Sequence, residues 1–319
     1  MFAYMVRRLL ILIPLLFVIC FLVYLGMFLT PGDPVSYMIG PEAMQNLKPA
    51  ELEALKEALG LNQPFIIRFL LWLGGVMKGD FGYSLQSGVP IKNIVLARLP
   101  ATLELSGVAL LLSTVFGSLL GTVSALKRGS IGDNALTVAG MIGVSIPQFV
   151  FGLAAIVVFT LKLHWLPVGG RIEPDDVTFW DRFPNLVMPS LVLAATMVAG
   201  VMRYSRSSML DSMNREFIKT ARSKGLPEWR VNFVHGFRVA LLPVIVLIGF
   251  RLPMLLGGSV IVEQVFQWPG IGNEFVAAVR SYNYPLIMMI AFFSVFAVLI
   301  ASFLIDLLTA WLDPRVKFE

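Results

Sequence analysis

Six long apolar runs constrain this chain more than any other feature of its sequence. A helix needs about 20 apolar residues to cross a bilayer, because the hydrocarbon core is about 30 Å thick and each residue rises about 1.5 Å. The runs fall at residues 9–30, 101–126, 135–163, 187–202, 239–262 and 286–312. The sequence therefore predicts an all-α integral membrane protein with about six transmembrane helices.

The composition supports lipid as the main solvent of the chain. Hydrophobic residues make up 57% of the sequence and charged residues only 14%, whereas a soluble domain carries about 25% charged residues. The first apolar run follows Arg7 and Arg8, as the apolar part of a secretory signal does. This run is too long for a signal peptide and no small-residue cleavage site follows it, so we expect it to remain as the first span.

The basic residues indicate how the chain is oriented. With the N-terminus in the cytoplasm, the inward-facing segments hold most of the lysines and arginines, eight of them within residues 203–238. Cytoplasmic loops of membrane proteins carry such an excess. We therefore expect both ends of the chain in the cytoplasm. The same rule makes the 203–238 segment a loop of a membrane protein rather than a nucleic-acid-binding surface.

Two segments between the apolar runs are too long to be simple turns. In the outer one, 31–100, residues 49–60 have a proline near the start, a glycine at the end and leucines on one face. This pattern predicts a short amphipathic helix, and residues 65–77 predict a second, more apolar one. The outer segment either caps the outer ends of the spans or binds a partner outside the cell, and the sequence favours neither.

The inner segment, 203–238, contains a short helix whose two ends are both marked. Asn214 is the candidate N-cap, Phe217, Ile218 and Ala221 form an apolar face, and Gly225 supplies a left-handed stop. A solvated connector has little need for such definition. The pattern therefore predicts a helix that fits a groove in another protein.

The sequence lacks the residue patterns of an enzyme. It has no Gly-Lys dipeptide, and hence no phosphate-binding loop, and neither a G-x-S-x-G nor an H-E-x-x-H pattern. Cys20 is the one cysteine, and His164 and His235 lie far apart, so we expect no metal site and no cofactor on this chain. The energy for any transport must come from another chain or from a gradient.

The inner helix resembles a motif of a known family. The segment 219–225 (KTARSKG) is similar to the E-A-A-x-x-x-G loop in permease subunits of ATP-binding-cassette importers. Lys219 and Thr220 depart from the first two positions of that loop, a departure familiar in the dipeptide/oligopeptide/nickel branch. Further segments similar to that branch are 30–34 (TPGDP), 59–64 (LGLNQP), 79–84 (GDFGYS), 98–102 (RLPAT), 203–210 (RYSRSSML), 262–272 (VEQVFQWPGIG) and 312–315 (LDPR).

The resemblance implies the type I importer permease fold, with a first span and outer loop in residues 1–98 and a five-helix core in residues 99–313. It implies an ATP-driven importer in a prokaryotic plasma membrane. This chain resembles the first of two similar permeases, which work with two ATP-binding subunits and an extracytoplasmic solute-binding protein. ATP and Mg²⁺ would bind to the partner ATPases. The residues that the resemblance assigns to coupling are Phe217, Lys219, Thr220, Ala221 and Gly225.

Two questions stay open from the sequence. The resemblance favours di- or oligopeptides as the solute, with nickel chelates, opines and oligosaccharides as alternatives. A gradient-driven secondary transporter is the alternative class, but we find neither an internal repeat nor a carboxylate at mid-span, both of which are common in such carriers.

Arg251 is unusual because it lies near the middle of the predicted fifth span, where an arginine costs about 2.5–3.5 kcal/mol on insertion. One interpretation is that it bonds carbonyls loosened by Pro253, above all that of Gly249. It could instead pair with the partner permease, or it could line the translocation path.

Overall fold

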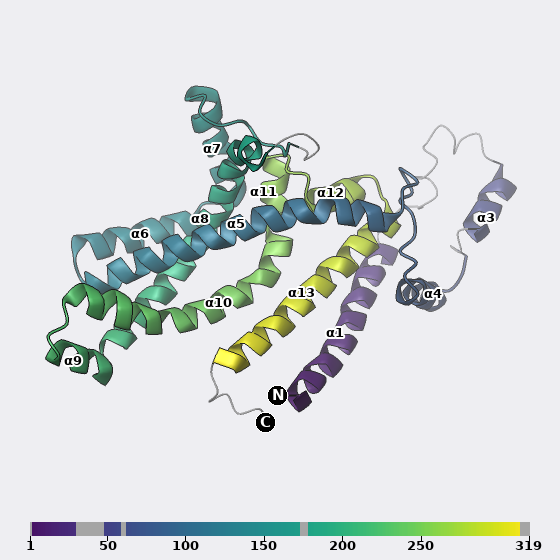
Figure 1. Ribbon diagram of the computed structural model, residues 1–319. Coiled ribbons are helices and arrows are strands. Elements are labelled where there is room, and N and C mark those ends of the chain that lie inside the picture. The colour runs from purple at the N-terminus through teal and green to yellow at the C-terminus, as the bar shows by residue number, and fades with distance from the viewer. Residues whose placement is uncertain (1, 30–47, 59–61, 173–177, 313–319) are drawn as a thin grey trace. The chain divides into compact units, whose positions relative to one another are not determined.

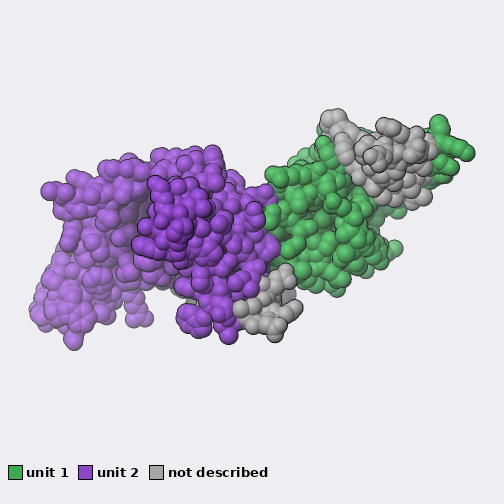
Figure 2. Space-filling model, turned by 90° about the horizontal axis from the view of Figure 1, so that it is seen from above, with its two compact units in different colours: residues 1–100, 270–299 green, residues 101–269, 300–319 purple. Residues whose placement is uncertain are grey.

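The computed structural model describes residues 2–29, 48–58, 62–172 and 178–312, and it is built of helices. The chain forms two compact units (Figure 2), residues 1–100 with 270–299 and residues 101–269 with 300–319. Segments 30–34 and 313–315, which carry part of the family resemblance, lie outside the described residues. The division into residues 1–98 and 99–313 stays a prediction.

Within the described residues, five helices are long and apolar enough to cross a membrane (Figure 1). They are α1 (Phe2–Leu29), α5 (Ile91–Leu126), α8 (Phe179–Met213), η3 (Arg230–Gly236) continued by α10 (Phe237–Gly258), and α13 (Tyr284–Leu312). A bent pair of helices makes a sixth span if it is counted as one. The expectation of about six spans is therefore met.

The bent pair corrects the prediction for the third apolar run. Residues 135–163 do not form one helix: α6 (Ile131–Ser145) is followed by α7 (Gln148–Ala155) and its π-helical continuation η1 (Ile156–Lys162), bent by 100°. Pro147 at the break has no N–H to donate and disfavours a helical conformation of the residue before it. Ile146 is accordingly extended, with φ −79° and ψ 124°.

The first unit is organised around aromatic packing between α1 and α4 (Phe65–Met77). The ring of Phe69 is buried and contacts Phe17, Phe21 and Tyr24 edge-on, with centroids 5.3–5.4 Å apart. The two helices predicted in the outer segment are confirmed, since α4 spans 65–77 and α3 is Pro49–Ala58. Helix α12 (Ile271–Arg280), the first part of α5 and the first part of α13 also belong to this unit.

The second unit is built around α8, which packs closely against α5. Gly117 and Gly121, one turn apart on α5, have no room for a side chain: a Cβ at Gly121 would lie 2.8 Å from Ser205 Cβ. Small residues spaced in this way let membrane helices approach closely. At 35 residues, α8 is about 52 Å long, so the helix continues well beyond the fourth apolar run, 187–202.

Two of the segments that carry the resemblance meet at one end of this second unit. The Nε1–H of Trp268 donates to the Ala101 carbonyl at 2.8 Å. Glu263, on α11 (Val260–Val265), is buried and accepts from the Thr102 hydroxyl at 2.9 Å and from the Ser259 hydroxyl at 2.8 Å. Residues 101 and 102 of α5, about three turns after its start, are therefore held against α11 and the turn that follows it.

Candidate functional site

The inner segment forms a helical hairpin, residues 214–236, which we call the coupling hairpin. Its first helix, α9 (Glu216–Ser223), joins the ends of α8 and η3–α10 (Figure 1). The prediction that Asn214 caps α9 is wrong: Asn214 ends α8, and the extended residue Arg215 precedes α9. Asparagine suits either end of a helix, so the sequence alone did not distinguish the two.

The C-terminal end of α9 is as predicted. Gly225 has φ +71°, a left-handed conformation that glycine adopts at little cost. The Leu226 N–H bonds the Ala221 carbonyl at 3.4 Å and the Gly225 N–H bonds the Arg222 carbonyl at 2.9 Å. This pair of bonds is the Schellman motif, which satisfies carbonyls at the helix end. The turn after α9 is therefore fixed by its backbone.

The coupling hairpin has an inner and an outer face. Ile218 and Ala221 are buried against Val231 of η3, and Phe217 is half-buried beside them. Lys219 and Thr220 are exposed on the outer face. Of the five predicted coupling residues, the structure thus places Phe217 and Ala221 in the internal packing of the hairpin and Lys219, Thr220 and Gly225 at its surface. Their role in coupling stays a prediction.

The coupling hairpin is anchored to the end of α8. The Ser212 hydroxyl, buried on α8, donates to the Gly236 carbonyl at 2.9 Å. Gly236 has no room for a side chain, because a Cβ there would lie 2.9 Å from the Met213 sulfur and 3.0 Å from the Met209 methyl group. The hairpin is therefore held in one orientation relative to α8.

Sequence reasoning missed the largest exposed side chain of the coupling hairpin. Trp229 is 58% exposed, and the Arg230 guanidinium lies 5.2 Å from the centre of its ring. Exposed tryptophans and arginines are common anchors of protein interfaces. Nearby, Arg222 forms two hydrogen bonds with Glu228 at 2.9 and 3.3 Å. The signal that could have found Trp229 is its place just after the Gly225–Pro227 turn.

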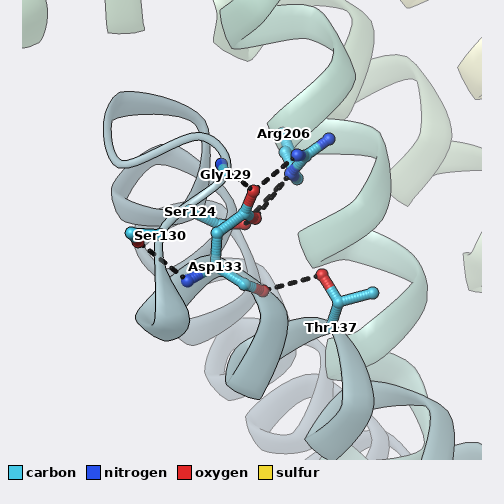
Figure 3. A network of polar contacts seen from close by, with 6 residues as sticks. All are labelled: Ser124, Gly129, Ser130, Asp133, Thr137 and Arg206. Atoms are coloured by element: carbon cyan, nitrogen blue, oxygen red, sulfur yellow. Dashed lines mark hydrogen bonds and ion pairs between the residues drawn. The ribbon is translucent and has the colours of Figure 1, made fainter.

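A buried ion pair ties α6 to α8 (Figure 3). The Asp133 side chain, 4% exposed, accepts from Arg206 Nε at 2.9 Å and from Arg206 Nη2 at 2.7 Å. The hydroxyl of Ser124 and the backbone N–H of Gly129 also donate to this carboxylate. We call these four residues the inner clamp.

The inner clamp joins three helices at the end of the unit that carries the coupling hairpin. Ser124 comes from the last turn of α5, Asp133 from the first turn of α6, and Arg206 from α8, seven residues before its end. The sequence showed Arg206 only as one of many basic loop residues, because its partner lies 73 positions away. The clamp makes the ends of these helices one rigid block.

Arg251 on α10 does not bond the Gly249 carbonyl. Its Nη1 donates to the Met197 carbonyl on α8 at 3.0 Å. The guanidinium lies over Gly200, where a Cβ would come within 3.1 Å of Arg251 Cζ. The interpretation that Arg251 bonds a backbone carbonyl is thus confirmed, but the predicted partner, Gly249, is wrong. Helix α8 packs against α10 closely enough for the Met197 carbonyl to accept the bond instead.

Comparison with known proteins bears on the whole chain. Residues 117–318 match the family described as the inner membrane component of binding-protein-dependent transport systems, and residues 1–106 match its N-terminal component. The oligopeptide transport system permease protein AppB of Bacillus subtilis is 41% identical over 321 residues, and the alignment covers 100% of both chains.

Two further relatives are aligned along their whole length. The di/tripeptide transport system permease protein DppB of Pseudomonas aeruginosa is 35% identical over 338 residues, and the glutathione transport system permease protein GsiC of Escherichia coli is 34% identical over 320 residues, each with 100% of both chains covered.

A crystal structure of an amino acid ABC transporter with histidines resembles this chain with a TM-score of 0.50, at 14% identity, over 69% of this chain and 94% of that one. At that identity the likeness shows the fold alone, which is the type I importer fold. Helices that can span a membrane and the family match together place the chain in the inner membrane. The chain belongs to the family of inner membrane components of binding-protein-dependent transport systems, the permease subunits of ATP-driven importers, which carry no ATPase activity of their own.

Proposed function

We propose that this chain is one of two non-identical permeases in a five-component peptide importer. Two ATP-binding subunits, which bind ATP and Mg²⁺, and one extracytoplasmic solute-binding protein complete the assembly. Peptides are the solute because the relatives that align along the whole chain are named for oligopeptides, di- and tripeptides and glutathione, itself a peptide. Nickel chelates, opines and oligosaccharides are less well supported, since none of these relatives is named for them.

The coupling hairpin is the observation that carries the mechanism. Its inner face is packed against its own chain, its turn is fixed at Gly225, and its outer face offers Lys219, Thr220 and Trp229 to another protein. Because Ser212 joins the hairpin to α8 and the inner clamp joins α8 to α5 and α6, a displacement of the hairpin by an ATPase moves these helices together. Closure of the ATPases is thereby converted into movement of the spans.

Gly225→Asp tests this mechanism. The exposed glycine has no atom within 4 Å of a built Cβ, so the new side chain changes the surface that meets the partner and leaves the internal packing intact. We expect peptide uptake and transport-linked ATP hydrolysis by the reconstituted importer to fall about tenfold, equivalent to about 1.4 kcal/mol. Peptide binding by the solute-binding protein should not change.

Gly88→Asp is the matched control. Gly88 has φ +67° and equally open surroundings, but it lies in the first unit, outside the coupling hairpin. An aspartate there carries the same backbone strain and the same charge, and we expect uptake to stay near that of the wild type. Equal losses in the two variants would show that the hairpin is only a connector.

A further inference from the structure

One exposed stripe of α8 is polar throughout its inner half. Between residues 200 and 211 the exposed side chains are Arg203, Tyr204, Ser207 and Asp211, whereas Val201, Met202, Ser205 and Met209 are buried. Residues 203, 207 and 211 are four positions apart, so they lie along one face of the helix. A continuous polar track thus leads from Gly200 to the end of α8 that carries the coupling hairpin.

Arg251 lies at the outer end of this track, beside Gly200. It reaches across from α10, donates to the Met197 carbonyl and covers Gly200. Arg203, next along the track, is exposed and lies three residues after Gly200 on the same helix. Among the residues that the structure describes, no carboxylate forms an ion pair with either arginine. Within the described residues, neither of these two positive charges is therefore neutralised by an ion pair.

Arg203 begins the segment expected in the cytoplasm, whereas Arg251 lies near the middle of its span. An arginine without a counter-charge there is unfavourable in lipid, where it costs several kcal/mol and acts in proton, ion or substrate paths more often than in structure. It becomes favourable where water reaches the track and an anion passes along it. A guanidinium binds a carboxylate through two parallel N–H groups, and only one N–H of Arg251 is used by Met197. Gly200 lets the guanidinium lie directly against α8, because a side chain there would collide with it.

We propose that Arg251 and Arg203 form an anion site in the translocation path that receives the carboxylate of the solute. This inference rests on the proposed function as a peptide importer, because every peptide with a free C-terminus carries that group. The site gives the permease its own preference for acidic solutes, separate from the selection made by the solute-binding protein.

The charge of the track can be measured without a solute. In a Cys20→Ser background, Ser207→Cys places a thiol on the track and Ser223→Cys places a reference thiol on the coupling hairpin. Each is labelled, in the assembled transporter, with a negatively charged sulfonatoethyl and a positively charged trimethylammonium-ethyl methanethiosulfonate. The ratio of the anionic to the cationic labelling rate at residue 207, divided by that at 223, reports the local potential.

Arg251→Gln should lower this ratio roughly fourfold, the effect of one unit charge about 10 Å away in water. Arg251→Lys, which keeps the charge, should leave it near the wild-type value and controls for altered packing. An unchanged ratio in Arg251→Gln overturns the anion site. So does a thiol at 207 that reacts with neither reagent while the thiol at 223 reacts, because the track would then be closed to water.

Uptake of trialanine and of its C-terminal amide by the reconstituted importer identifies the ligand group. The quantity compared is variant uptake divided by wild-type uptake for each peptide, which cancels the preference of the solute-binding protein. Arg251→Gln should reduce this quantity at least threefold more for trialanine than for the amide. Equal reductions overturn the carboxylate assignment. If the wild type imports neither peptide, the proposed solute is wrong, and the labelling ratio still decides whether the anion site exists.

Discussion

Helices α1 and α8 are both membrane-spanning, yet they present opposite surfaces. Only 6% of the most apolar stretch of α1 is buried within the chain, against 61% for α8. What α1 leaves exposed is apolar, including Leu10, Val18 and Leu22 at 49–63% exposure. What α8 leaves exposed in its inner half is polar. The exposed surfaces of the two helices are therefore suited to different surroundings.

This difference shows that the polarity of the free side of a membrane helix, the side not packed against its own chain, indicates the medium that it meets. An apolar free side is stable against lipid tails or an apolar neighbour, whereas a charged free side costs several kcal/mol there. Because α8 buries its apolar side chains against α5 and α6, its polar side must meet water or polar groups in the assembled importer. The comparison therefore separates a span whose exposed side suits an apolar medium from one whose inner half suits water.

The largest effect should come from the inner clamp, which holds α8 in its packed position. Arg206→Met leaves the Asp133 carboxylate, itself 4% exposed, without its cation, and a buried charge that has lost its partner is strongly destabilising. We expect a corresponding loss in the free energy of unfolding, measured on the purified permease by denaturant titration.

The double variant Arg206→Met with Asp133→Asn is its control. With both charges removed, no carboxylate is left buried without a cation, so much of the lost stability should return. A double variant as unstable as the single one would mean that α8 is held by packing alone.

A lysine placed on each free side tests the comparison directly. Val18→Lys puts a charge on the apolar side of α1 and should raise the free energy of insertion by about 3 kcal/mol. Ser207→Lys puts the same charge on the polar track of α8 and should change the amount of inserted permease little. The measurement is the amount of permease in isolated membranes. Similar losses for both lysines would contradict the view that the two free sides face different media.

The smallest effect should come from two glycine substitutions. Gly121→Ala brings a Cβ to 2.8 Å from Ser205 Cβ on α8, and overpacking of this kind costs about 2 kcal/mol. Gly26→Ala on α1 meets no described atom within 4 Å and should be neutral or slightly stabilising, because alanine is the better helix former. Thermal unfolding in detergent should rank the two in this order.

Local patterns of the sequence were enough to predict the spans, α3, α4 and the left-handed stop at Gly225. Each depends on residues within one or two turns of one another, through apolar length, proline and glycine placement or backbone conformation. The bend at Pro147 was missed because the apolar run continues on both sides of it with only Ser145 and Gln148 as polar neighbours and no charge, so hydrophobicity gave little sign of a break.

The parts of the site that could not be predicted depend on long-range neighbours. Asp133 and Arg206 are 73 residues apart, and Arg251 and Met197 are 54 apart. Nothing in either local sequence indicates which helix will lie opposite. The choice of Gly249 as the partner of Arg251 followed from considering one helix alone, whereas the structure offers the carbonyl of another.

The inner clamp also has a consequence for how the protein is made. Asp133 is synthesised 73 residues before Arg206, a delay of roughly 4–15 s at bacterial and eukaryotic rates of translation. During that interval the Asp133 carboxylate can accept hydrogen bonds only from residues that have already been synthesised. Ser124 and the Gly129 N–H, within nine residues of it, are such partners. The turn between α5 and α6 can therefore form first, with its hydrogen bonds to Asp133 already made. Arg206 binds the carboxylate later, once α8 has been synthesised.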